Sequence, residues 1–174
     1  MYTALATETE LYFAIEGDIQ QARYEALAAT RPNLTEVLDF AMSVQQSRRS
    51  RRGQSLQNHF ATLLRAWRIP FTAQCKTESG ERPDFLVPGC GQYHEPDFPA
   101  DRLRMIACKS TAKERWRQVL NEAARIPDKY LLTVDLGLTL PTIRAMTTAR
   151  LQPFLPEPLI ETTYKAHPLS LIHI

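Results

Sequence analysis

Two short apolar segments, each associated with one charged residue, constrain the fold of this chain most. The first spans residues 82–87 and places Asp84 among apolar neighbours, and the second spans residues 103–108 and is followed directly by Lys109. A carboxylate in an apolar strand is costly to bury unless it is paired or binds a metal. Adjacent strands would bring Asp84 and Lys109 together at one edge of a sheet. We therefore expect a buried sheet with a polar site at its edge.

The rest of the chain alternates between helical and strand patterns. Pro32 separates two N-terminal helices, and either Asn33 or Thr35 can cap the second. A later helix has one apolar face, typical of core packing, made of Leu56, Phe60, Leu63, Leu64 and Trp67. The expected helices span 9–29, 33–46, 56–67 and 113–125, with another from 139; the expected strands span 71–76, 82–87, 103–108, 130–134 and 151–155. This order predicts an α/β domain with a central mixed β-sheet flanked by helices.

Composition excludes several classes of protein. No apolar run approaches the ~20 residues of a membrane helix, and the N-terminus lacks the basic segment of a secretory signal, so we expect a cytoplasmic protein without a membrane partner. The net charge of +2 argues against a non-specific DNA coat but leaves room for a local basic patch. The three cysteines form no C-x-x-C pair. We therefore expect buried reduced thiols rather than a disulfide framework or a zinc site.

A basic run contains Arg48, Arg49, Arg51 and Arg52. Four arginines within five positions cannot all be paired internally, so we expect the run to lie on the surface. One interpretation is a solvated charge run. The other is a clamp for DNA phosphates, because the guanidinium fork matches phosphate oxygens in two-point contacts. The sequence leaves both interpretations open.

The chain is long enough for one domain with a core of its own. We predict an N-terminal helical segment, residues 1–46, packed on a catalytic domain, residues 47–168, whose natural C-terminus is missing. The last six residues, 169–174, look like translated sequencing adapter and are expected to be a non-native tail. His173 is for this reason no candidate site residue.

Cleavage of a phosphodiester with a hard divalent cation requires oxygen ligands and a cation near the attacking water. Asp84 and Lys109 meet part of this requirement. Two residues before the lysine, where a second acid is common, stands Ala107. Glu122 can supply the acid from the following helix, because Arg115 and Glu122 are two turns apart on one face. The alternative is that Asp84 caps a turn and that Lys109 and Glu122 are surface charges.

The same predicted helix begins with Lys113, Glu114 and Arg115. Lysine and arginine can donate to guanine O6 and N7, and glutamate can accept from cytosine N4. The triplet therefore has the chemistry to read adjacent G·C pairs in a major groove. The alternative is an ordinary solvated first turn, in which Glu114 suits the helix dipole.

Together these residues resemble the catalytic domain of EcoRII-like type II restriction endonucleases, in the PD-(D/E)xK nuclease superfamily. The resemblance runs from about residue 47 to 156 and is densest at 76–78, 82–88, 109–122 and 126–133. It implies Mg²⁺-dependent double-strand cleavage at short sites with CC/GG ends, of CCWGG or CCNGG type. It also implies that Asp84 and Glu122 bind the metal, that Lys109 is the catalytic lysine, and that Lys113, Glu114 and Arg115 read bases.

The resemblance further implies a homodimer on double-stranded DNA, because two active sites must face two strands related by a two-fold axis. A gene for a cytosine methyltransferase is expected nearby, since host DNA needs protection. The chain departs from the family pattern at Gln57, where a glutamate is usual. Gln57 can bind a metal-bound water but brings no charge. Two alternatives therefore stay open: a site-specific DNA-binding relative with impaired catalysis, and a repair nuclease of the same fold.

Overall fold

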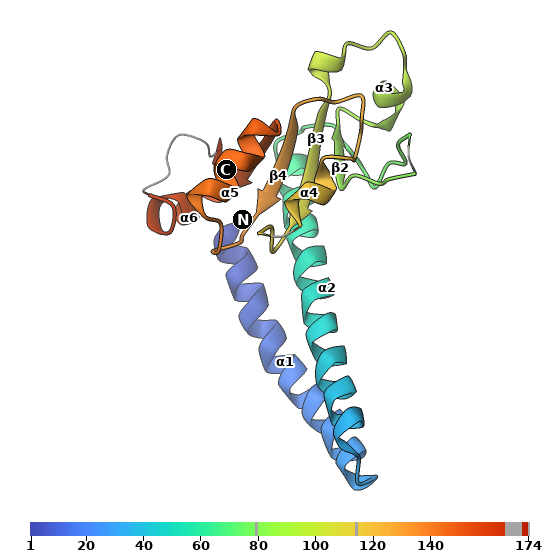
Figure 1. Cartoon of the computed structure of the whole chain (residues 1–174), viewed down its shortest axis with the longest axis vertical. Helices are drawn as coiled ribbons and strands as arrows, with labels where there is room; N and C mark the ends of the chain where they lie inside the picture. The colour runs from blue at the N-terminus through green and yellow to red at the C-terminus, as the bar shows by residue number, and fades with distance from the viewer. Residues whose placement is uncertain (79, 114, 166–171, 174) are drawn as a thin grey trace. The chain divides into compact units, whose positions relative to one another are not determined.

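The computed structural model describes residues 1–78, 80–113, 115–165 and 172–173 (Figure 1). The chain forms two compact units, Met1–Ser55 and Leu56–Ile174. Within the described residues, no helix combines the length and the apolar character needed to span a bilayer. The predicted division into 1–46 and 47–168 stays a prediction; in the structure, one continuous helix crosses that boundary. Of the predicted tail, only residues 172 and 173 are among those described.

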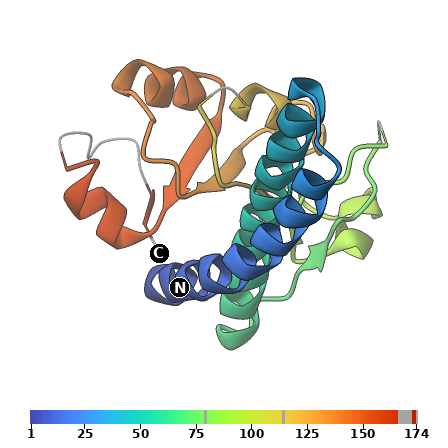
Figure 2. The same ribbon diagram turned by 90° about the horizontal axis from the view of Figure 1, so that it is seen from below.

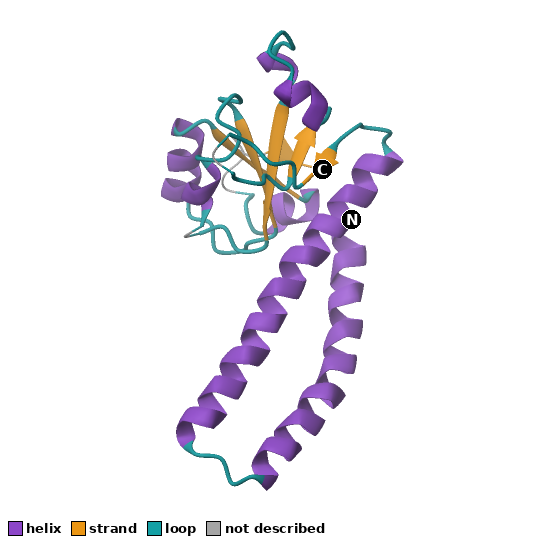
Figure 3. Cartoon of the chain, turned by 90° about the vertical axis from the view of Figure 1, so that its right-hand side faces the viewer, coloured by secondary structure: helices purple, strands orange, loops and turns teal. Residues whose placement is uncertain are grey.

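The first unit contains two long helices, which run side by side in Figures 1 and 3. Helix α1 spans Tyr2–Ala29, and helix α2 spans Leu34–Ala66, so only the first part of α2 belongs to this unit. Asn33 caps α2, as predicted. Its Oδ1 accepts from the Glu36 backbone N at 3.1 Å, and the Glu36 carboxylate accepts from the Asn33 backbone N at 2.8 Å. This reciprocal pair satisfies two otherwise unpaired backbone donors.

The predicted separation of a helix ending at residue 46 from one starting at 56 is wrong, because α2 continues through both. Arginine is a good helix former, and a glycine such as Gly53 costs a helix only about 1 kcal/mol relative to alanine. Contacts with α1 offset this cost. Arg48 Nε lies 2.7 Å from Glu16 Oε2, and Arg51 Nη2 lies 2.7 Å from Glu8 Oε1. Half of the basic run is therefore used inside the unit, which confirms that the four arginines are not all paired.

The second unit is built on one mixed sheet, as predicted, with six strands where the sequence predicted five. The strands follow in sequence order. The pairs β1–β2 and β2–β3 are antiparallel, and the pairs β3–β4, β4–β5 and β5–β6 are parallel. Their bounds are β1 Thr72–Ala73, β2 Phe85–Val87, β3 Arg104–Lys109, β4 Lys129–Thr133, β5 Leu151–Leu155 and β6 Ile172–His173. The predicted strands at 71–76 and 82–87 are thus shorter than expected, and Asp84 lies immediately before β2 rather than inside it.

Helices cover this sheet. The end of α2 packs Leu56, Phe60 and Leu64 into the core, and Phe60 meets the ring of Phe85 at 5.3 Å between centroids. Trp67, predicted to lie on the same buried face, is 53% exposed, because α2 ends at Ala66. Helix α5 packs on β5 (Figure 2). The remaining helices are α3 Cys90–His94, η1 Ala100–Arg102, α4 Trp116–Val119, α5 Leu140–Thr148 and α6 Glu157–Thr162.

The predicted helix from 113 to 125 is wrong, since only the short α4 forms there. Beyond α4, the Glu122 backbone N donates to Val119 O at 3.2 Å, three positions back, which is the tight pattern of a 3₁₀ turn. Ala123 has φ 48°, which ends any right-handed helix. Arg115 and Glu122 therefore do not share the face of one helix. The segment instead presents short turns on either side of the buried Trp116.

The expectation of three reduced thiols is partly wrong. Cys75 and Cys90 form a disulfide, with Cα atoms 5.7 Å apart, and Cys108 is a buried free thiol. The two bonded cysteines lie 15 residues apart in sequence. They meet because β1 and β2 form an antiparallel pair. The chain that leaves β1 at Cys75 therefore comes back along β2 and reaches Cys90 at the start of α3. A spacing of this length gives no local signal of pairing.

Candidate active site

Asp84 is the best-connected residue of the predicted site. Its Oδ1 accepts from Gln57 Nε2 at 2.8 Å and from Gln74 Nε2 at 2.9 Å, and its Oδ2 accepts from the Cys108 backbone N at 2.7 Å. The side chain is 7% exposed. All three donors are at least ten positions away in sequence, so the carboxylate does not cap its own turn. The antiparallel register of β2 with β3 brings Asp84 beside Cys108.

Lys109 is the last residue of β3, and its Nζ lies 3.7 Å from Asp84 Oδ2. Its side chain is 17% exposed and therefore largely buried. The two residues meet where β3 ends and β2 begins, which confirms that adjacent strands bring them together. The same ammonium acts on a second carboxylate, Glu122.

Glu122 lies just after α4 and is only 8% exposed. Burial raises the pKa of its carboxyl to about 7; the nearby charge of Lys109 opposes the rise and that of Asp84 adds to it. Its Oε2 is buried without a hydrogen-bond partner among the described residues. An unpaired buried carboxylate oxygen is costly. Glu122 is thus neither a surface charge nor the member of a complete hydrogen-bond network.

Lys129, which the sequence reasoning missed, supports this second carboxylate. It is the first residue of β4 and 7% exposed, and its Nζ donates to Leu120 O at 2.9 Å, two residues before Glu122. Burial lowers the pKa of Lys129, and the charge of Glu122 raises it. The signal available in the sequence was a lysine at the start of an otherwise apolar strand.

The donor set suits a divalent cation with oxygen ligands. Mg²⁺ is bound in proteins by one or two carboxylates together with water and substrate phosphate. Asp84 retains acceptor capacity beyond its three hydrogen bonds, because two carboxylate oxygens offer about four lone-pair sites. Glu122 Oε2 offers an oxygen that nothing else in the described chain uses. Asp84 and Glu122 are therefore the residues that fit a metal.

Gln57 contacts the candidate metal ligand Asp84, and its expected contact with a metal-bound water stays a prediction. Its amide donates directly to Asp84 Oδ1, so it serves as a hydrogen-bond donor to the buried carboxylate. A glutamate at this position would place a second negative charge against Asp84 and would need a cation between them. With glutamine, the carboxylate is satisfied by the protein alone.

The predicted base-reading residues lie next to this site in sequence. Lys113 and Arg115 are exposed, and Glu114 lies outside the described residues. Asp135, which follows β4, holds the segment: its Oδ2 accepts from the backbone N of Ala112 at 2.7 Å and of Lys113 at 3.0 Å. Sequence reasoning missed Asp135, because the contact joins residues more than twenty positions apart.

The basic run, residues 48–52, belongs to the first unit, and two of its four arginines form ion pairs there. Arg48 and Arg51 bind acids of α1, whereas Arg49 and Arg52 are exposed and form no ion pair within the described part of the chain. A phosphate clamp made from this run therefore stays a prediction, with Arg49 and Arg52 as its available cations.

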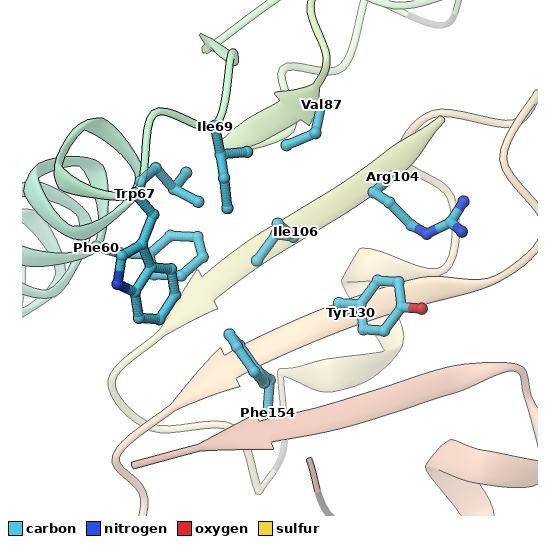
Figure 4. A pocket seen from close by; sticks show the side chains of 9 residues that line it. Phe60, Trp67, Ile69, Val87, Arg104, Ile106, Tyr130 and Phe154 are labelled. Carbon is cyan, nitrogen blue, oxygen red and sulfur yellow. The ribbon is translucent and has the colours of Figure 1, made fainter. Parts of the chain in front are cut away.

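An apolar pocket of about 260 Å³ lies on the sheet, apart from the polar site. Figure 4 shows side chains from the end of α2 facing side chains from the strands. Its lining is Phe60, Leu64, Trp67, Ile69, Val87, Arg104, Ile106, Tyr130 and Phe154. None of Asp84, Lys109 or Glu122 contributes to it, and one charged residue among nine gives it no evident chemistry.

Comparison with known proteins gives the family. The family described as EcoRII C terminal matches residues 12–173, nearly the whole chain. The chain belongs to this family. Over 128 residues it is 39% identical to the type II restriction enzyme EcoRII of Escherichia coli, covering 73% of the chain and 32% of that relative. It is 31% identical over 125 residues to the type II restriction enzyme SsoII of Shigella sonnei, covering 66% of the chain and 40% of that relative. The chain thus spans about a third to two-fifths of these curated relatives.

Two solved structures share the fold of this chain. Metal-depleted Ecl18kI in complex with uncleaved DNA has a TM-score of 0.76 at 21% identity, covering 97% of this chain and 64% of that chain. The PspGI–substrate DNA complex has a TM-score of 0.71 at 20% identity, covering 88% of this chain and 63% of that chain. At these identities the likeness shows the fold, which is the restriction-endonuclease-like α/β fold predicted from the sequence.

Proposed function

We propose that this protein is a type II restriction endonuclease that cuts both strands of DNA at short sites with CC/GG ends, of CCWGG or CCNGG type. The observation that carries the proposal is the buried group of Asp84, Lys109 and Glu122, in which Glu122 Oε2 has no partner among the described residues. The curated relatives are named restriction enzymes, and Ecl18kI and PspGI were solved with DNA. Both facts support DNA as the substrate.

Asp84 and Glu122 would hold the metal, which we propose to be Mg²⁺. When bound, such an ion would polarise the scissile phosphate and favour ionisation of a nearby water. The two proposed ligands differ in how the protein holds them before a metal binds. Three hydrogen bonds fix Asp84 in place, so its orientation needs no further ordering. Burial of Glu122 disfavours its charged form, and a cation would reverse that preference.

Lys109 would act on the attacking water and on the transition state. Its Nζ, 3.7 Å from Asp84 Oδ2, can donate a hydrogen bond to the water that attacks phosphorus. Its charge offsets the negative charge that builds up on the pentavalent transition state while the bond from phosphorus to the leaving oxygen breaks.

Lys113 and Arg115 would donate to guanines and Glu114 would accept from a cytosine. The exposed Arg49 and Arg52 would contact phosphates. Two copies of the chain, acting as a homodimer, would present two sites to the two strands. We further propose that the enzyme works in the cytoplasm and that a cytosine methyltransferase encoded nearby protects the host DNA.

Plasmid cleavage tests the proposal. Supercoiled plasmids carrying CCWGG, CCNGG or neither site are incubated with the chain in Mg²⁺ and in EDTA. We expect linear product from site-bearing plasmid in Mg²⁺ only, and none from Asp84→Ala. Intact plasmid across all site contexts, from protein shown to be folded by circular dichroism, would contradict the proposal.

A second candidate is a DNA-binding relative without cleavage, favoured by the hydrogen bond from Gln57 to the metal-ligand candidate Asp84. It predicts site-specific retardation of a CCNGG duplex with no cutting in Mg²⁺ or Mn²⁺, and a gain of cutting in Gln57→Glu. A repair nuclease would instead cut without the CC/GG requirement. In that case Lys113→Ala and Arg115→Ala would leave the choice of substrate unchanged.

A further inference from the structure

The disulfide of the second unit sits beside a histidine. Cys75 follows β1, and Cys90 and His94 are the first and last residues of α3. His94 Nε2 lies 3.9 Å from Cys75 Sγ, and the possible ligand atoms of all three residues lie within 4.8 Å of one another. Residues four apart on a helix share a face, so α3 directs Cys90 and His94 to the same point. This cluster takes no part in the site described above.

We propose that Cys75, Cys90 and His94 form a zinc site when the disulfide is reduced. Two thiolates and one imidazole are a ligand set that Zn²⁺ accepts, with water in a fourth position. A sulfur and a nitrogen bound to one tetrahedral Zn²⁺ lie about 3.6 Å apart, given Zn–S and Zn–N bonds of about 2.3 and 2.05 Å. The 3.9 Å between Cys75 Sγ and His94 Nε2 is already close to this separation.

The backbone around the cluster is held by contacts that do not involve sulfur. The Tyr93 hydroxyl donates to the Glu78 carboxylate at 2.6 Å, and the Cys90 backbone N donates to Thr72 Oγ1 at 3.1 Å. Arg125 Nη1 donates to Glu95 O at 2.7 Å, just beyond α3. The three ligands would therefore stay near one another after the disulfide opens.

Opening the disulfide requires a reductant, and a dithiol supplies it. The bond between the two sulfurs breaks, two electrons and two protons pass to the cysteines, and the dithiol leaves as its own disulfide. Zn²⁺ then displaces the two thiol protons. His94 Nε2, which lies 3.0 Å from Lys76 O, would exchange that contact for the metal. This setting rests on the proposed function, since DNA restriction takes place inside the cell, where thiols are kept reduced.

The site has a direct structural consequence. Gln74, which donates to Asp84 Oδ1, is the residue immediately before Cys75. A metal bound by Cys75 would fix the end of β1 just as the disulfide does. The protein would thus keep Gln74 in place in both redox states.

Cobalt binding tests the inference. Protein reduced with a dithiol and freed of metal is titrated with Co²⁺, and we expect a thiolate-to-cobalt charge-transfer band that Zn²⁺ removes at one equivalent. His94→Ala should weaken Zn²⁺ binding by more than about tenfold. Cys75→Ser and Cys90→Ser should abolish the band, whereas Cys108→Ala, the matched thiol control, should keep it. Asp84→Ala should also keep it, because carboxylates give no thiolate band.

A second measurement needs no variant. In reduced native protein, Zn²⁺ should protect two thiols from a disulfide-exchange reagent, while the buried Cys108 stays unreactive with or without metal. Absence of the band in reduced wild-type protein, or of protection by Zn²⁺, would overturn the inference, as would a disulfide that survives the dithiol. None of these readouts uses DNA, so their failure is distinct from failure of the proposed nuclease.

Discussion

The two candidate metal ligands are held in opposite ways. Asp84 lies before a strand and accepts three hydrogen bonds, one of them from the backbone of the neighbouring strand. Glu122 lies among short turns, and one of its oxygens has no partner within the described residues. The first carboxylate is satisfied without a metal, whereas the second is not. This difference indicates that the sheet provides the fixed half of the site and that the cation would complete the other half.

The largest expected effect is loss of cleavage when Lys109 or Asp84 is replaced. Lys109→Ala should lower the cleavage rate on the order of 10²–10³-fold, because it removes the cation that faces the developing charge. Asp84→Ala should lower it at least as much. Rates are measured on a CCNGG plasmid in Mg²⁺, with Lys165→Ala as the exposed-lysine control. A Lys109→Ala enzyme with wild-type rate would remove Lys109 from the mechanism.

The next effect is on the unfolding free energy of metal-free protein and depends on Glu122. The pKa of Glu122 is raised to about 7 in the folded state from an ordinary 4.5, so its protonated form favours folding at low pH. That contribution is complete below about pH 4.5 and is lost as pH rises through 7, at a cost of roughly 3 kcal/mol. Glu122→Gln, which stays neutral, should therefore be more stable than wild type at pH 8 in EDTA and similar at pH 4.5.

Urea unfolding at the two pH values measures this difference. The control is Glu161→Gln, since Glu161 is exposed on α6 and should show no such dependence on pH. A Glu122→Gln variant that loses stability at pH 8 would mean that the charged carboxylate has a stabilising partner.

Asp84→Asn should act in the opposite direction. One edge of its amide would present N–H donors toward Gln57 and Gln74 or toward the Cys108 backbone N–H, leaving a buried donor unpaired. The expected loss is about 1–3 kcal/mol of unfolding free energy in EDTA at pH 8. Equal stability of Asp84→Asn and wild type in urea would show that the hydrogen bonds of Asp84 are not needed for folding.

The smallest effect is expected at Gln57. Gln57→Ala removes one of three donors to Asp84 and should cost about 1 kcal/mol in urea unfolding. Cleavage should change by no more than about tenfold, because Gln74 and the Cys108 backbone still hold the carboxylate. A hundredfold loss of rate with unchanged stability would instead make Gln57 a residue that acts on the substrate or its water.

The sequence predicted the elements whose signals are local. The strand at Leu151–Leu155 and the start of α5 were recovered because apolar patterning and the Thr139 cap are both contained in a few residues. Asp84 and Lys109 were recovered because a charge at the end of an apolar strand is rare. Their side-chain separation of 3.7 Å then followed from strand pairing.

Elements fixed by distant contacts were not recovered. Of the helix predicted for 113–125, only the short α4 forms, because Asp135 binds the backbone of Ala112 and Lys113 and Ala123 adopts positive φ. Glu122 still lies beside Asp84 and Lys109, although it does not share a helix face with Arg115. The Cys75–Cys90 pair depends on chain folding in the same way, and no local pattern marks it. The contact of Lys129 with Leu120 O also depends on chain folding, although a lysine at the start of an apolar strand was a local signal.

The bond from Asp135 to the Ala112–Lys113 backbone has a consequence for where a DNA strand would be cut. β3 and β4 pair in parallel with Lys109 opposite Thr133, and Asp135 follows two residues later to fix the segment that starts at Ala112. If Lys109 acts at the scissile phosphate, as proposed, the span between it and the residues that would touch bases has a fixed length. Under the proposed function, the offset between the sequence read and the bond broken is a property of the scaffold, set before any DNA arrives.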